Sequence, residues 1–368
     1  MRDIIDAYLN GLEITKDQLS PKERMQLFAQ GKEIDRIPCC LELDEAAAPL
    51  LGFSIAEYNL CPEKICQLQD FLFTRFHPDC LTVSTGSLAM AEAMGAELEY
   101  RHSYPLALKQ TAPKEVLASV RPVDVERDGR LPILLEALSL LKQKLADKVT
   151  LVGSLAAPFT VAAGLLGQAN LLTALAEQPK ELKQLLDCIT ENNESYMQRL
   201  LDLELGVHFL DPLSSLDFIS LEQYREFSMP YLRKNVDYLR SRGSSCSLQI
   251  YGRSNGLWWS VKQLGISCFG PNGDEDMDTA VGILGEHMCL LGNVSAAAVL
   301  GAGSPLDVLR AARSCIRQGH DSPRGFILAA DGPAPLGCSV ANMQALMDAA
   351  RIFGSYPLKP ELWEEAGK

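Results

Sequence analysis

"GFILAADGPAPLGCSVANMQALMDAARIFG", residues 325–354, contains the unit that decides the fold. It begins with a short apolar run, Phe326 to Ala329, and ends with a segment of helical period, Val340 to Phe353. Short apolar runs that alternate with helical segments are typical of buried parallel strands and their connecting helices. We therefore expect one strand-then-helix unit here, with Asp331 and Gly332 opening the loop between its two parts.

The same unit recurs along the chain, and eight apolar runs can be recognised in all. They are Ile37 to Leu43, Cys80 to Ser84, Thr150 to Ser154, Val207 to Leu210, Ser247 to Tyr251, Ile266 to Phe269, Met288 to Leu291 and Phe326 to Ala329. The helical segments between them include Pro62 to Phe76, Leu131 to Leu145, Lys180 to Leu203, Leu221 to Arg240, Pro305 to Gln318 and Val340 to Phe353. Eight such units favour a closed barrel over a doubly wound sheet. The predicted fold is an α/β (β/α)8 TIM barrel.

Two parts of the chain depart from this rhythm. Residues 1–35 precede the first expected strand and predict an N-terminal helical extension of two short helices, the second of which begins with Ser20 as N-cap and Pro21 as first residue. Residues 36–368 would form a single barrel. The stretch at about 86–130 interrupts the alternation of strands and helices, and we expect an insertion there over the barrel mouth.

Composition narrows the classes of function. With 47% hydrophobic and 22% charged residues, the chain has the composition of a globular enzyme. Its formal charge of -13 disfavours nucleic acid as a partner. The 11 cysteines show no CxxC spacing and indicate reduced thiols in a cytoplasmic protein. The N-terminus lacks the pattern of a signal peptide, and Pro158 breaks the most apolar stretch, so no membrane span is expected.

Candidate site residues follow the expected strands, because barrel enzymes place their chemistry at the ends where the strands finish. Carboxylates there could bind a cation, hold polar substrate groups or move protons. Alternatively, Asp211 and Asp331 are turn residues that bond their own backbone, and Tyr251 packs in the barrel. The candidates are Glu42, Asp44, Asp211, Tyr251, Arg253, Asn272, Asn293 and Asp331.

Histidines give a weaker signal. The five in the chain show no HxxxH or HxH spacing that would place two imidazoles on one metal ion. His208 lies within an expected strand and could face the barrel interior, where it would be either a satisfied core residue or a substrate contact. No Walker loop, dinucleotide fingerprint or nucleophile elbow is present.

Six segments, in order and covering nearly the whole chain, resemble the uroporphyrinogen decarboxylase superfamily. This superfamily also contains the methylcobamide:coenzyme M methyltransferases. The segments are "GKEIDRIP" (31–38), "AEAMGAELEY" (91–100), "LVGSLAAPFTVAAGLLG" (151–167), "FLDPLSSLDFISLEQYREFSMPYLRKNVDYLR" (209–240), "CLLGNVSAAAVLGAGSPLDVLRAARSCI" (289–316) and residues 325–354.

The decarboxylase branch carries an arginine-rich motif after the first strand and an aspartate after the second. Here residues 39–52 read "CCLELDEAAAPLLG", with acids instead of arginines, and Gly86 stands at the aspartate position. A polyanionic porphyrinogen beside Glu42, Asp44 and Glu45 would be repelled. Classical porphyrinogen decarboxylation is therefore disfavoured.

The methyltransferase branch binds zinc through a His-x-Cys pair at the end of the fifth strand and a cysteine after the eighth. The zinc ion activates a thiol by lowering its pKa. Gln249, Tyr251 and Gly332 occupy these positions here, so zinc is not expected. Cys246 and Cys338 could in principle rebuild a site, but both are more simply interpreted as buried thiols.

The resemblance implies a methyltransferase that depends on cobalamin carried by a corrinoid protein, and that uses a small-molecule methyl donor or acceptor other than a zinc-bound thiol. Two alternatives stay open: decarboxylation of uroporphyrinogen or another carboxylate, with Arg101, Arg121 or Arg253 as the cation, and a non-catalytic barrel that binds a corrinoid or tetrapyrrole. The predicted catalytic residues are Tyr251, Asp211 and Asp331, and the predicted substrate-binding residues are Glu42, Asp44, Gln249, Arg253, Asn293 and His208.

Overall fold

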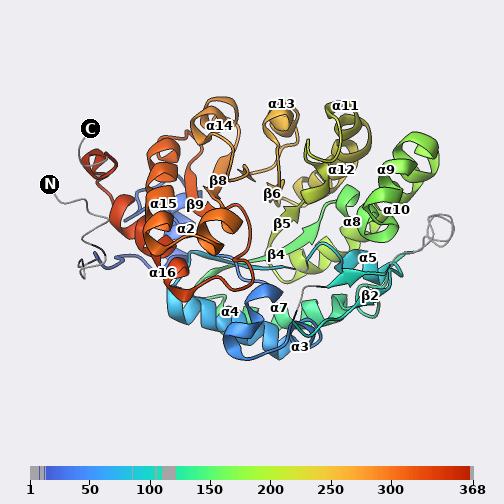
Figure 1. Cartoon of the computed structure of the whole chain (residues 1–368), viewed down its shortest axis with the longest axis horizontal. Coiled ribbons are helices and arrows are strands. Elements are labelled where there is room, and N and C mark those ends of the chain that lie inside the picture. The colour runs from blue at the N-terminus through green and yellow to red at the C-terminus, as the bar shows by residue number, and fades with distance from the viewer. Residues whose placement is uncertain are drawn as a thin grey trace.

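Seven parallel strands form the central sheet of the computed structural model, which describes residues 8, 12, 14–84, 86–103, 106–109 and 122–364. The sheet is curled, and its connecting helices lie around the outside (Figure 1). The predicted TIM-barrel-like fold is confirmed. In spatial order the strands are β1 (Cys80–Val83), β4 (Thr150–Ala156), β5 (Gly206–Leu210), β6 (Cys246–Gln249), β7 (Cys268–Gly270), β8 (Cys289–Val294) and β9 (Phe326–Ala330).

The segment predicted as the first strand closes the ring between β9 and β1. Leu328 of β9 donates its backbone N–H to the carbonyl of Pro38 and accepts one from Cys40, both at 2.9 Å. Asp79, just before β1, donates to the carbonyl of Cys39 at 3.0 Å. Pro38 has no N–H for a ladder, and the segment makes one parallel bridge, between Cys39 and Leu328. The prediction of a full strand here was wrong, although its place in the ring was right.

The helices predicted between the strands are present, and most begin and end within one residue of the expected bounds. The exception is the helix expected at 221–240, where Pro230 cannot donate the usual hydrogen bond and a π-helical turn, Tyr224–Ser228, intervenes. No single helix in the described part of the chain is long and apolar enough to cross a membrane. The main outer helices are α4 (Pro62–Phe76), α7 (Leu131–Leu145), α8 (Pro158–Leu166), α9 (Gln168–Glu177), α10 (Pro179–Asp202), α11 (Leu221–Gln223), α12 (Met229–Ser241), α13 (Trp258–Val261), α14 (Met277–Leu284), α15 (Pro305–Gly319) and α16 (Val340–Phe353).

Helix α2 (Pro21–Ala29) covers the end of the barrel at which the strands begin. Ser20 caps it through a reciprocal capping box, as its sequence predicts. The helix packs against β1 and β4, and Met25 lines the barrel interior together with Cys80 and Thr150, the first residues of those strands. The other predicted N-terminal helix lies almost entirely outside the described residues.

The stretch predicted as an insertion contains α5 (Ala89–Ala93) and a two-stranded antiparallel ribbon of β2 (Leu98–Glu99) and β3 (Ala107–Leu108). Part of it, 104–105 and 110–121, lies outside the described residues. The division of the chain into an extension, a barrel and an insertion stays a prediction.

A buried carboxylate joins α2, β1 and the segment 37–43 that closes the ring, which we call the closing segment. Arg24 Nη1 donates to Asp79 Oδ1 at 2.6 Å, and Arg36 Nη1 donates to Asp79 Oδ2 at 2.7 Å. The same Oδ2 accepts the backbone N–H of Cys39 at 2.7 Å. None of the three charged side chains is more than 1% exposed. Asp79 is therefore the point at which the N-terminal part of the chain is attached to the barrel.

Replacing Asp79 with asparagine should lower the free energy of unfolding by about 3 kcal/mol, because breaking a buried ion pair leaves a charge uncompensated. Asp17 and Asp35 still contact the two arginines and limit the loss. Chemical denaturation measures the effect. The matched control is Asp237→Asn, whose side chain is 59% exposed and whose change should stay below about 0.5 kcal/mol. Equal losses in the two variants would contradict the central role of Asp79.

Candidate functional site

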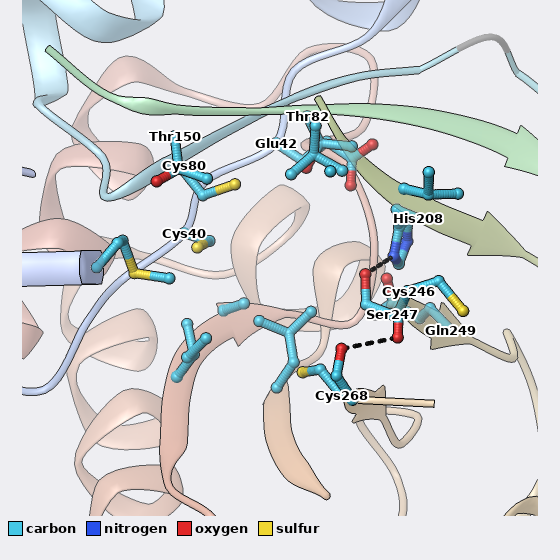
Figure 2. Close-up of a pocket in the computed structure, with 18 of the residues that line it drawn as sticks. Cys40, Glu42, Cys80, Thr82, Thr150, His208, Cys246, Ser247, Gln249 and Cys268 are labelled. Atoms are coloured by element: carbon cyan, nitrogen blue, oxygen red, sulfur yellow. Dashed lines mark hydrogen bonds between the residues drawn. The ribbon is translucent and has the colours of Figure 1, made fainter. Parts of the chain in front are cut away.

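A cavity of about 240 Å³ lies inside the barrel, lined by the closing segment and all seven strands (Figure 2). Every second residue of a strand faces inward, which brings side chains of distant segments together. Most of the wall is apolar or carries thiols, and its polar members include Glu42, His208 and Gln249. None of the described residues that line it is a lysine or an arginine. The cavity therefore contains no cationic side chain to hold an anion.

His208 is one of the predicted substrate contacts, and it lies in this cavity. Its Nδ1 is 2.7 Å from the hydroxyl of Ser247 on the neighbouring strand (Figure 2). Burial lowers the pKa of His208 to about 4, so the imidazole is neutral at neutral pH. His208 can exchange hydrogen bonds with a ligand without adding charge.

Glu42 enters the cavity from the closing segment (Figure 2). Its Oε1 is buried and has no hydrogen-bond partner among the described residues. Burial, with a smaller contribution from the nearby Asp44, raises the pKa of Glu42 to about 8. At neutral pH this side chain is therefore mostly a neutral carboxylic acid that can donate a proton.

Gln249, Tyr251 and Gly332 meet at the mouth, the end of the barrel where the strands finish. Gln249 Nε2 is buried without a partner in the described structure, and so is the Tyr251 hydroxyl. The Tyr251 ring lies beside Gly332, where an added Cβ would come within 3.6 Å of Tyr251 Cε1. Burial, and then the charges of Glu42, Asp44 and Asp331, raise the pKa of Tyr251 well above its usual value. The phenol stays protonated.

Two further cavities open at the mouth, and Tyr251 lines both. One, of about 260 Å³, is also lined by Asp44. The other, of about 420 Å³, is also lined by Asn272, Asp331 and Gly332. Gly332, beside the Tyr251 ring, lines the interior cavity as well, so Tyr251 lies at the mouth close to that cavity without lining it.

Gln249, Tyr251 and Gly332, at the positions where the resemblance implies zinc ligands, do not fit a zinc ion. Glycine offers no side-chain ligand, and amide or phenol groups are poor zinc ligands beside imidazole and thiolate. Within the described ranges, no group of three or more histidines, cysteines, aspartates or glutamates could hold a metal. Cys246 lines the interior cavity, whereas the Cys338 thiol contacts the carbonyl of Leu300 at 3.2 Å. These two cysteines do not belong to one site.

Asp211, predicted as a proton donor, lies behind β5. Its carboxylate is buried and accepts hydrogen bonds from the hydroxyls of Thr160, at 2.8 Å, and Ser228, at 3.4 Å. It lines none of the three cavities. Burial raises its pKa to about 6. These partners are side chains, whereas the turn interpretation has Asp211 bond its own backbone. Asp211 therefore connects β5 to the outer helices, and its catalytic role stays a prediction.

Asp331 and Asn293 also hold loops in place, through hydrogen bonds to backbone groups. Asp331 accepts the backbone N–H groups of Gly273, at 2.8 Å, and Ala296, at 2.7 Å. Asn293 is 5% exposed, and its amide donates to two backbone carbonyls in the 272–275 loop, both at 2.8 Å. Both side chains shape the mouth, and Asp331 also borders one of its cavities.

The remaining predicted contacts, Asp44 and Arg253, lie in different surroundings. Asp44 borders a mouth cavity and caps a short helical turn by accepting the N–H of Ala46 at 2.9 Å. Burial raises its pKa to about 6. Arg253 is 62% exposed on its side chain and donates to the carbonyl of Leu216 at 2.8 Å. Arg253 therefore lies on the outer rim, away from the three cavities.

Arg130 is a mouth residue that no sequence pattern singles out, because it precedes α7 without a motif. It is 3% exposed, donates to Asn59 Oδ1 and lies 3.5 Å from Glu92. Asn59 in turn donates to Glu45 at 2.6 Å. Asn59 and Glu45 both line a mouth cavity. Arg130 is thus a buried cation directly behind the wall of that mouth cavity.

Comparisons with known proteins agree with this architecture. A family model described as uroporphyrinogen decarboxylase (URO-D) matches residues 20–353. A methylcobamide:CoM methyltransferase of Methanosarcina barkeri is 26% identical over 340 residues, covering 88% of this chain and 94% of that protein. A uroporphyrinogen decarboxylase of Chlorobaculum tepidum is 26% identical over 254 residues, covering 66% of this chain and 71% of that protein. The solved structure of a methyltransferase from Methanosarcina mazei has a TM-score of 0.80 at 22% identity, covering 90% of this chain and 98% of that one.

Glu42 should make stability depend on pH. Its folded pKa of about 8 lies above the ordinary value of 4.5, so the folded protein keeps a proton that the unfolded chain releases within this window. Stability from Glu42 therefore falls as pH rises through it. The melting temperature of Glu42→Gln, which cannot titrate there, should fall less than that of the unaltered protein between about pH 5.5 and about pH 8.5. If the melting temperatures of the two proteins fell equally over this pH range, the raised pKa of Glu42 would be contradicted.

Proposed function

The chain belongs to the uroporphyrinogen decarboxylase family, and we propose that it transfers a methyl group between a small molecule and a corrinoid carried by a partner protein. The methyltransferases named above match it over a larger share of its length than the decarboxylase does. The acidic mouth also suits a methyl carrier better than a polyanionic porphyrinogen.

One observation carries the proposal that this transfer uses no zinc-bound thiolate. The Tyr251 ring lies beside Gly332, so an aromatic side chain borders the position from which a third ligand would come. In the described structure Gln249 keeps an unpaired polar atom on the interior cavity and Tyr251 keeps one at the mouth. These groups can donate hydrogen bonds to a leaving atom, but they do not supply the positive charge with which a zinc ion lowers the pKa of a thiol.

The mouth suits the approach of a partner protein. Three apolar side chains are exposed on segments that follow strands: Phe218 after β5, at 41%, Trp259 after β6, at 57%, and Leu336 after β9, at 46%. A corrinoid brought there would supply a cobalt centre that accepts or donates the methyl group. This chain would contribute the interior cavity and the Tyr251 hydroxyl at the mouth.

Elemental analysis tests the absence of zinc directly. We expect protein purified without chelators to contain well under one zinc ion per chain, because the described ligand set does not fit the metal. A content of one zinc per chain would contradict the proposal and would favour a zinc-bound thiol as the methyl acceptor.

Tyr251→Phe should reduce methyl transfer about tenfold, the effect of one lost hydrogen bond in the transition state. The melting temperature should stay nearly unchanged, since the hydroxyl has no partner in the described structure. The rate of methyl transfer to or from free cobalamin measures the effect. Tyr196→Phe is the matched control, because its hydroxyl, on α10, is also buried without a partner in the described structure but lines none of the three cavities. Equal rates for the two variants would remove Tyr251 from the mechanism.

Decarboxylation of a carboxylate is the second candidate, and Arg130 is the observation that favours it. Of the cations named from the sequence, Arg101 is 44% exposed and paired with Glu99, Arg253 lies on the rim, and Arg121 falls outside the described residues. Arg130 is buried at the mouth but shared with Asn59 and Glu92. Release of carbon dioxide from uroporphyrinogen would support this function.

A further inference from the structure

Four acids follow the strands or lie in the closing segment, and they differ in what their carboxyl groups already bind. Asp211 is bonded to two hydroxyls behind β5, Asp331 to two backbone N–H groups, and Asp44 to the N–H of Ala46. Glu42 alone lines the interior cavity and keeps a buried oxygen without a partner in the described structure. Glu42 is therefore the acid that remains available to a ligand.

The surroundings of Glu42 exclude an anionic ligand. No described lining residue is a lysine or an arginine, and a sulfonate or carboxylate in this cavity would be desolvated without a partner. The walls include Leu41, Val152, Leu291 and Ile327, which suit an apolar body. The other titratable groups that line this space are His208 on β5 and the thiols of Cys40, Cys80, Cys246 and Cys268. Asp44 and Tyr251 line a mouth cavity and interact electrostatically with Glu42.

Two hydrogen-bond donors on the wall of this cavity lack an acceptor in the described structure. One is Gln249 Nε2, which is buried, and the other is the O–H of a protonated Glu42, on the wall of the same cavity. Buried donors of this kind are normally satisfied. An ether oxygen accepts hydrogen bonds and donates none, so it complements both.

We infer that Glu42 is the proton donor of this barrel and that the interior cavity takes a small, neutral methyl ether. The inference rests on the proposed function and names its substrate class. In the step, the bond between oxygen and the methyl carbon breaks, and its electron pair stays on oxygen. The proton of Glu42 moves to that oxygen. The methyl carbon receives a new electron pair from the nucleophile of the partner, a reduced corrinoid. The products are an alcohol or phenol, the methylated nucleophile and the Glu42 carboxylate, which regains a proton from water.

Binding tests the substrate class without turnover. Calorimetric titration of the full chain with methoxybenzene should show an affinity that is constant at low pH and falls above about pH 8, where Glu42 loses its proton. The affinity of Glu42→Gln should not change over this range. We expect no binding of 2-mercaptoethanesulfonate, an anionic thiol. An affinity with the same pH dependence in both proteins would overturn the role of Glu42.

Turnover tests proton donation. With cob(I)alamin as nucleophile, Glu42→Gln should release phenol from methoxybenzene about 100-fold more slowly than the unaltered protein. With methyl 4-nitrophenyl ether the deficit should shrink to less than about tenfold, because 4-nitrophenolate leaves without a proton. Glu136→Gln, an exposed glutamate on α7, is the matched control and should leave both rates unchanged. A purely structural effect of Glu42→Gln would slow both ethers equally and would overturn the inference.

The two proposals fail in different ways. Methylation of 2-mercaptoethanesulfonate without turnover of either ether would overturn the substrate class and leave corrinoid-dependent methyl transfer standing. Absence of methyl transfer with the ethers and with the thiol would overturn the proposed function, and the inference with it.

Discussion

The carboxylate of Asp79, held between two buried arginines, is the constraint on which the rest of the structure depends. It attaches α2 and the closing segment to the start of β1. The closing segment has few ladder hydrogen bonds of its own. These ion pairs therefore hold it in the ring, where a full strand would be held by its ladder. Because Glu42 lies three residues beyond Cys39, the position of that acid inside the barrel depends on the same anchor.

Much of the fold could be predicted because apolar runs and helical periods are local signals. Seven of the expected strands formed, and α4 and α16 have the expected bounds. The failures had local causes too. Pro38 itself has no N–H to donate to a ladder, and Pro230 places a π-helical turn within an expected helix. No local pattern predicts that an ion pair between Arg36 and Asp79, 43 residues apart, holds the closing segment in place of ladder hydrogen bonds.

The site was less predictable, because its properties depend on the direction of side chains after a strand has ended. Gln249 and His208 lie on strands, and alternation turns them inward as expected. Asp211 follows the last residue of β5 and turns outward to Thr160. The acidity of Glu42 depends on burial by distant segments, which no local pattern contains. Arg130 reaches the mouth from a stretch without recognisable motif.

The contact between Tyr251 and Gly332 also makes the two positions interdependent. A Cβ at Gly332 would lie 3.6 Å from the ring, an ordinary contact distance, so a small side chain fits there and would pack against the aromatic ring. The effect of a substitution at one position therefore depends on the side chain at the other, which is epistasis between residues 81 positions apart in the chain.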